Sequence, residues 1–114
     1  MKIISPTLHG YLDYVTVLLF LIAPTIFGLS GMAGSFAYIL AVIHLTMTLI
    51  TDFPLGVTKQ LPFKIHGWVE RIVAPVLILL PFAFGFDATA RGFYIVIGIV
   101  IVLVGLFTDY SRTE

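Results

Sequence analysis

The sequence contains no cysteine and few charged residues. Only 11% of its 114 residues are charged, six Lys or Arg and six Asp or Glu, whereas a soluble domain carries about 25%. The lack of cysteine excludes thiolate metal sites and a disulfide scaffold. The zero net charge provides no basic surface for nucleic acid. No phosphate loop, nucleophile elbow or zinc-protease motif occurs, so the sequence favours a protein that is not an enzyme.

Apolar residues take the place of the missing charges. Hydrophobic residues make up 60% of the chain, and the mean hydropathy is +1.12. A soluble globule of this size must cover most of its surface with polar groups, so a soluble enzyme and a disordered segment are both disfavoured. The length allows a single domain, which we expect to be one membrane domain over residues 1–114.

Uncharged runs long enough to cross a membrane divide the chain. Residues 14–51 carry no charge and are interrupted by a glycine-rich turn at 28–34, while 72–86 and 92–108 form two further runs. A spanning helix needs about 20 mostly apolar residues. We therefore expect an all-α integral membrane protein with four transmembrane helices, near 11–29, 34–51, 68–86 and 91–109.

A shift of 57 residues aligns the two halves of the chain without a gap. Ten of the 46 aligned positions from 9 to 54 are identical. The matched pairs include polar residues, which are scarce here: His9 with His66, Asp13 with Glu70, Thr51 with Thr108, and Asp52 with Asp109. We interpret this pattern as two tandem two-helix repeats. The first repeat covers about 9–54, a linker covers 55–65, and the second repeat covers about 66–111.

Two helices per repeat make both repeats cross the membrane in the same direction, as in transporters with parallel repeats. The expected four-helix bundle then has both termini and the linker on one side. That side carries five of the six basic residues: Lys2, Lys59, Lys64, Arg71 and Arg112. The positive-inside rule places it in the cytoplasm. We therefore expect a multi-pass protein of the cell membrane with both termini in the cytoplasm. Its expected partner is the lipid bilayer, and the sequence leaves open whether it forms a homo-oligomer.

The end of the first helix in each repeat has a shared pattern, Ala23-Pro-Thr-Ile-Phe-Gly-Leu29 and Leu80-Pro-Phe-Ala-Phe-Gly-Phe86. With the aromatic–acid pairs Tyr11–Asp13 and Trp68–Glu70, this pattern resembles the SPW-repeat family of small membrane proteins. The serine and tryptophan of that motif are replaced in both repeats. The resemblance implies the fold over nearly the whole chain and implies no particular activity.

Polar residues at the cytoplasmic ends of the helices form a candidate metal or proton site. The starts of the first and third helices and the ends of the second and fourth share this face, which carries His9, Asp13, Asp52, His66, Glu70 and Asp109. Each His–acid pair is four residues apart and lies on one helix face. Imidazole and carboxylate ligands suit divalent zinc, iron or manganese. A divalent transition metal is therefore the candidate cofactor.

An alternative interpretation places the same residues at the level of the lipid headgroups. There the acids cap helix N-termini, pair with Lys64 and Arg71, or are solvated. Capping does not account for Asp52 and Asp109, because both are expected at helix C-termini, where the helix dipole disfavours anions.

His44 falls in the middle of the second helix and aligns with Ile101, so it lies outside the repeated pattern. It is interpreted as a neutral histidine that is hydrogen-bonded to a neighbouring helix, for instance through a threonine. A haem ligand or proton relay is the alternative, and haem is weakened by the lack of a second histidine at that depth. Pro24, Pro75 and Pro81 are expected to kink their helices.

Three functions remain open. The scarcity of polar residues inside the membrane favours a structural or assembly protein without a catalytic site. A metal- or haem-binding protein that uses the cytoplasmic-face His/carboxylate cluster is the second. An oligomer that conducts a small solute or ion is the third.

Overall fold

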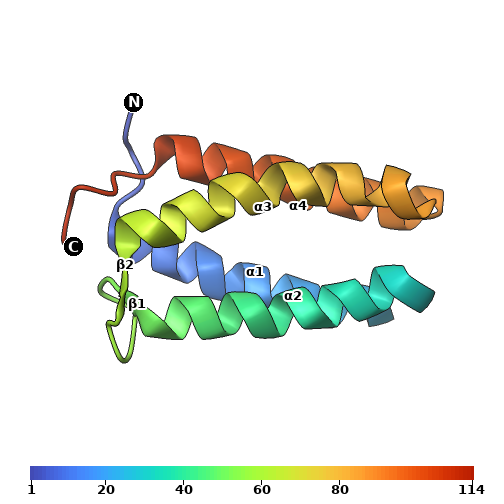
Figure 1. Cartoon of the computed structure of the whole chain (residues 1–114), viewed down its shortest axis with the longest axis horizontal. Coiled ribbons are helices and arrows are strands. Elements are labelled where there is room, and N and C mark those ends of the chain that lie inside the picture. The colour runs from blue at the N-terminus through green and yellow to red at the C-terminus, as the bar shows by residue number, and fades with distance from the viewer.

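Four helices run up and down in the computed structural model, which describes all of residues 1–114 (Figure 1). They are α1 (Pro6–Ile26), α2 (Gly31–Ile50), α3 (Phe63–Phe84) and α4 (Ala88–Phe107). Each helix is long and apolar enough to cross a membrane. The predictions of an all-α fold and of four membrane-spanning helices are therefore confirmed.

The helices begin three to five residues earlier than the sequence predicted and end one to three residues earlier. The prediction extended each apolar run to its flanking polar or aromatic residues, whereas capping residues that lie further out set the starts of α1 and α4. The Ser5 hydroxyl accepts a hydrogen bond from the Leu8 N–H at 3.1 Å, and Pro6 follows at the first helical position. At α4 the Asp87 carboxylate accepts one from the Ala90 N–H at 2.9 Å.

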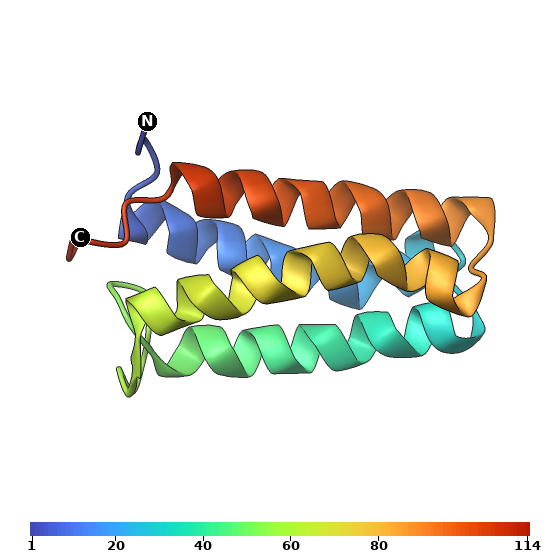
Figure 2. The same ribbon diagram turned by 45° about the horizontal axis from the view of Figure 1, so that its top comes forward.

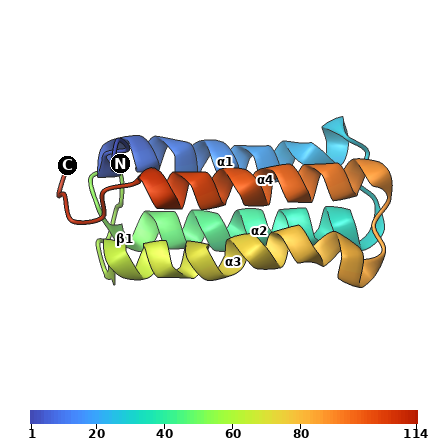
Figure 3. The same ribbon diagram turned by 90° about the horizontal axis from the view of Figure 1, so that it is seen from above.

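The four helices form two hairpins that lie side by side. α1 packs along α2 and α3 packs along α4, and the views in Figures 2 and 3 place α1 next to α4 and α2 next to α3. α1 and α3 are therefore diagonal neighbours across the centre of the bundle. Small residues allow the close contacts within the hairpins. A Cβ atom added at Gly98 of α4 would lie 3.0 Å from the carbonyl oxygen of Ala74 in α3.

Both termini and the connection between the hairpins lie at one end of the bundle (Figure 1). This end carries two short strands, β1 (Thr51–Asp52) after α2 and β2 (Leu61–Pro62) before α3, which pair in parallel. A second parallel bridge joins Ile4, ahead of α1, to Thr108, just after α4. Neither pairing was predicted from the sequence. The segment between α2 and α3 covers residues 51–62 and contains both strands, because α3 already begins at Phe63.

The three prolines predicted to kink their helices lie inside α1 and α3, and both helices continue past them. Pro24 lies two residues before the last residue of α1, and Pro81 lies three residues before the last residue of α3. The Pro24 carbonyl accepts the Leu29 N–H at 3.0 Å, and the Pro81 carbonyl accepts the Phe86 N–H at 2.9 Å. The prolines thus help to close the turns at the end opposite the termini.

Large apolar side chains cover the outside of the bundle. Leu18, Ile39, Leu79 and Leu103, one from each helix, are about half exposed or more. In water such a surface would expose far more apolar area than a monomeric protein tolerates. In a bilayer it is the surface expected to contact lipid.

Candidate metal centre

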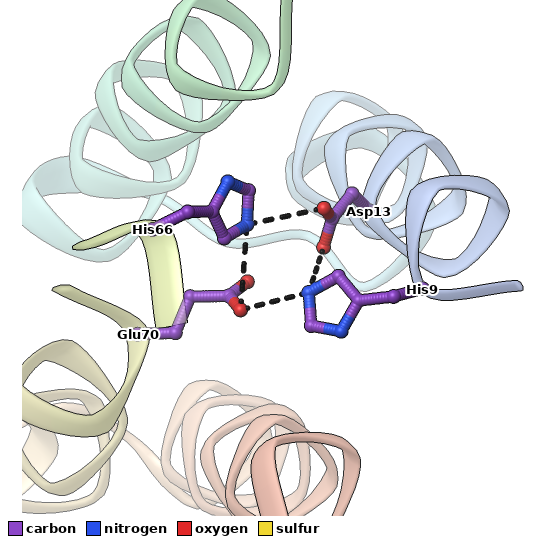
Figure 4. A group of neighbouring side chains, drawn as sticks. All are labelled: His9, Asp13, His66 and Glu70. Atoms are coloured by element: carbon purple, nitrogen blue, oxygen red, sulfur yellow. Dashed lines mark hydrogen bonds and ion pairs between the residues drawn. The ribbon is translucent and has the colours of Figure 1, made fainter. Parts of the chain in front are cut away.

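Two histidines and two carboxylates meet between the four helices, in the half of the bundle nearer the termini (Figure 4). His9 and Asp13 come from α1, and His66 and Glu70 come from α3. All four are buried, with both histidines fully excluded from solvent. One ligand atom from each of the four lies within 4.8 Å of all the others. The four-residue spacing puts each pair on one helix face, and the diagonal placement of α1 and α3 turns the two faces toward each other.

The four side chains form a ring in which each carboxylate contacts both imidazoles. His9 Nε2 lies 2.9 Å from Glu70 Oε1 and 3.2 Å from Asp13 Oδ1. His66 Nε2 lies 3.1 Å from Asp13 Oδ2 and 3.4 Å from Glu70 Oε1. We call these four residues the His/carboxylate ring. The same nitrogen of each imidazole faces the centre of the ring.

The opposite nitrogen of His9 is bound by Thr108. The Thr108 hydroxyl donates its proton to the Val104 carbonyl at 2.6 Å, so its oxygen is available as an acceptor for His9 Nδ1 at 2.8 Å. The network therefore assigns the imidazole proton to Nδ1. In the neutral imidazole the Nε2 lone pair then faces the two carboxylates.

His66 makes the corresponding contact with Thr51. The Thr51 hydroxyl donates to the Met47 carbonyl at 2.6 Å, and its oxygen lies 2.8 Å from His66 Nδ1. His66 and Thr108 lie 57 residues after His9 and Thr51, so each histidine is held by a threonine of the other sequence half. Such outer partners fix the orientation and tautomer of histidines that bind metals.

A third histidine, His44 of α2, approaches the ring. Its Nε2 atom lies 3.4 Å from Asp13 Oδ1 and 3.8 Å from Glu70 Oε2. The interpretation that a threonine holds this side chain is not supported, because Thr48 donates only to the His44 main-chain carbonyl. The carboxylates of α1 and α3 face it instead. The sequence did not predict that His44 lies beside these carboxylates, because His44 has no counterpart in the second half of the chain.

Three buried polar atoms of this group have no hydrogen-bond partner: Asp13 Oδ2, His44 Nε2 and His66 Nε2. Asp13 Oδ2 and His66 Nε2 are close enough to attract each other but are poorly aligned for a hydrogen bond. Buried polar atoms without a partner are rare and costly. Two of them, Asp13 Oδ2 and His66 Nε2, belong to the His/carboxylate ring, which is the pattern expected of residues that share a cation.

Asp52 and Asp109, which the sequence also assigned to this site, do not join the ring. α2 and α4 end at Ile50 and Phe107, and the next residues are extended. Successive side chains of an extended segment point in opposite directions. Thr51 and Thr108 therefore point inward, while Asp52 is exposed and Asp109 binds Ser111. The prediction was therefore wrong for both acids, and the threonine one position before each acid contacts a histidine of the ring instead.

Two glycines allow other residues to cover the ring. A Cβ atom added at Gly67 would lie 2.6 Å from the Tyr110 ring, and one at Gly10 would lie 2.7 Å from the Leu55 side chain. The Tyr110 ring also lies at 5.7 Å from the His9 ring, centroid to centroid. The His-Gly dipeptide occurs in both halves of the sequence, as His9-Gly10 and His66-Gly67. This repetition could have indicated that a glycine is needed beside each histidine.

An apolar cleft between α1 and α4 leads to the two carboxylates. It has a volume of about 550 Å³, and Asp13 and Glu70 line it together with mainly apolar side chains. The space related to it by the 57-residue shift, between α2 and α3, has a volume of about 50 Å³. His44 lines this smaller space. The ring is thus more open on the α1–α4 side than on the α2–α3 side.

Comparisons with family models, with curated proteins and with solved structures found no match to this chain.

Proposed function

We propose that this chain is a small metal-binding membrane protein in which the His/carboxylate ring holds one divalent transition-metal ion. The observation that carries the proposal is the orientation of the two histidines. Thr108 and Thr51 engage Nδ1 of His9 and His66, so both Nε2 atoms face the carboxylates. In their neutral form these nitrogens are acceptors that face acceptors, an arrangement that a shared cation stabilises.

The charges of the ring support a divalent ion. Ionised Asp13 and Glu70 contribute two negative charges in a site that excludes water. Two protonated imidazoles balance them when no metal is bound. One divalent cation with neutral imidazoles balances them equally well, so metal binding exchanges two protons for one ion.

The ligand set favours zinc, iron or manganese. Two imidazoles and two carboxylates are ligands of intermediate character, and no cysteine is present to select a softer ion. His44 lies close enough to serve as a further nitrogen ligand after a small adjustment. Haem finds little support, because the carboxylates of Asp13 and Glu70 occupy the space between the two histidine rings that a macrocycle would need.

The other functions have weaker support. A conducting oligomer would need a polar path through the membrane. The histidines, acids and basic residues inside the helices, Arg91 excepted, gather near the end with the termini, and the cleft beyond them is mainly apolar. A structural or assembly role requires only the fold and remains the function assigned if the ring binds no metal.

Membership of the SPW-repeat family stays a proposal that rests on the two Pro–Gly patterns and the aromatic–acid pairs.

The end that carries the termini is proposed to face the cytoplasm. It holds Lys2, Lys59, Lys64, Arg71 and Arg112, whereas Arg91 lies at the opposite end. The positive-inside rule relates this asymmetry to orientation. The His/carboxylate ring then lies toward the cytoplasmic side of the cell membrane.

The test is metal analysis of protein purified in detergent without a chelator. We expect about one zinc, iron or manganese ion per chain, and its loss from the double variant His9→Ala/His66→Ala. The matched control is Asp109→Asn, which removes an acid from the same end of the bundle but outside the ring. Metal-free wild type that gains no thermal stability from added zinc or manganese would overturn the proposal in favour of a structural role.

A further inference from the structure

A polar hollow lies at the end of the bundle that carries the termini. It has a volume of about 530 Å³, and its lining includes Lys2, Lys64, Trp68, Arg71, Asp109 and Tyr110. We call it the basic pocket. It shares no residue with the His/carboxylate ring. Its lining comes from the N-terminal segment, the start of α3 and the C-terminal segment, which meet only in the folded chain.

The three basic side chains of this pocket are not neutralised by acids. All six ion pairs of the structure are made by histidines, so Lys2, Lys64 and Arg71 form none. Asp109 is the one acid that lines the pocket. Hydrogen bonds from the Ser111 hydroxyl and N–H lower the pKa of Asp109 and keep it ionised at neutral pH. Three positive charges and one negative charge leave a net charge of +2.

Arg71 is already held in position at this pocket. Its guanidinium carbon lies 4.9 Å from the centroid of the Trp68 ring and 5.5 Å from that of Tyr110. Contacts with aromatic faces stabilise a guanidinium without using its N–H donors. Lys2 is also fixed, because its ammonium donates to the Leu106 carbonyl at 3.1 Å near the end of α4. The donors of Arg71 therefore remain free for a ligand.

An exposed apolar strip on α3 begins at the same place. Its residues are spaced by three or four and lie on one face of the helix: Ile65, Trp68, Ile72, Val76 and Leu79. Each is between 47% and 66% exposed. The strip therefore runs from the basic pocket toward the middle of the membrane. Trp68 belongs to both the strip and the pocket lining.

We propose that the basic pocket binds the phosphate group of an anionic phospholipid whose acyl chains lie along the α3 strip. Phosphate oxygens match the planar fork of an arginine, and lysines add charge without a fixed geometry. Free phosphate has the same headgroup chemistry, but the adjoining apolar strip gives a lipid additional contacts that an inorganic ion lacks. The net positive charge selects an anionic lipid over a zwitterionic one.

Trp68 provides a direct measurement, because it is the single tryptophan of the chain. The protein is placed in micelles that contain phosphatidylglycerol or phosphatidylcholine with brominated acyl chains, which quench a nearby indole. We expect phosphatidylglycerol to quench Trp68 at a lower mole fraction than phosphatidylcholine. Equal quenching by the two lipids would overturn the proposal.

Paired variants separate the pocket from general surface charge. Lys2→Gln/Lys64→Gln removes two charges from the pocket, and Lys59→Gln/Arg112→Gln removes two from the same end but outside it. We expect the affinity for phosphatidylglycerol to fall about fivefold for each pocket charge removed, with a smaller loss in the control. Equal losses in both variants would refute a specific site. Displacement of the lipid by millimolar inorganic phosphate would overturn the lipid assignment and make free phosphate the ligand.

Discussion

His9 and Thr108 stand 99 residues apart in the sequence, and the imidazole Nδ1 lies 2.8 Å from the threonine Oγ1. This hydrogen bond joins the first helix to the residue that follows the last one. It also determines which nitrogen of His9 faces the carboxylates. His66 and Thr51, 15 residues apart, repeat the same geometry. The candidate metal centre therefore depends on two threonines that would not themselves touch the ion.

The threonines provide the first prediction. Thr51→Val/Thr108→Val removes the acceptors of both Nδ1 protons, so the imidazoles lose the restraint on tautomer and orientation. Loss of such outer partners lowers metal affinity by about 10- to 100-fold, which a competition titration with a chromogenic chelator measures. Thr→Ser at both positions keeps the hydroxyls and should retain the affinity. Thr46→Val is a further control, because the Thr46 hydroxyl donates only to a carbonyl of its own helix.

The second prediction concerns protons. If two imidazolium ions balance the carboxylates before metal binding, each bound ion displaces two protons. Below neutrality the apparent affinity then increases about 100-fold for each unit by which the pH is raised. Calorimetric titration with zinc in buffers of different ionisation enthalpy counts the protons released. A release close to zero would show that the histidines are already neutral in the metal-free protein.

The third prediction compares a buried acid with a surface acid. Glu70→Gln leaves two buried imidazoles with one carboxylate, and removal of one partner from a buried pair costs about 3–5 kcal/mol. Asp109→Asn removes a carboxylate that is partly exposed and lies outside the ring, so its loss should lower the stability much less. The difference is read from thermal unfolding in detergent. Similar losses in the two variants would argue against a buried ring.

The fourth prediction concerns orientation. Cysteines introduced at Thr58 and Thr89 lie at opposite ends of the bundle, and both positions are exposed. A membrane-impermeant maleimide applied to intact cells should label Thr89→Cys and leave Thr58→Cys unlabelled until the cells are opened. The chain has no cysteine of its own, so no background substitution is needed. The reverse pattern would place the termini outside the cell.

The sequence predicted the four helices and all four residues of the His/carboxylate ring, for simple reasons. Long apolar runs between charges define membrane spans regardless of tertiary detail. His9 with Asp13 and His66 with Glu70 follow from a four-residue spacing that any helix converts into a shared face. The helix ends were less predictable, since local hydrogen bonds such as the Ser5 cap fix them.

The remainder of the site depended on tertiary structure. His44 reaches the carboxylates because α2 turns this face toward the centre of the bundle, and one helix alone does not reveal that rotation. The exchange of Asp52 and Asp109 for Thr51 and Thr108 depended on where α2 and α4 end. A shift of one residue in an extended segment reverses the side that a side chain faces. The repeat itself stays a prediction.

The bridge between Ile4 and Thr108 has a consequence for biosynthesis. The threonine that holds His66 precedes it in the chain, at position 51, whereas the one that holds His9 follows all four helices, so His9 can be held only after residue 108 has been synthesised. A nascent chain that stops earlier leaves His9 without the threonine that fixes its tautomer, and leaves Ile4, ahead of α1, without its bridge partner. Under the proposed function, such a truncated product binds its ion weakly.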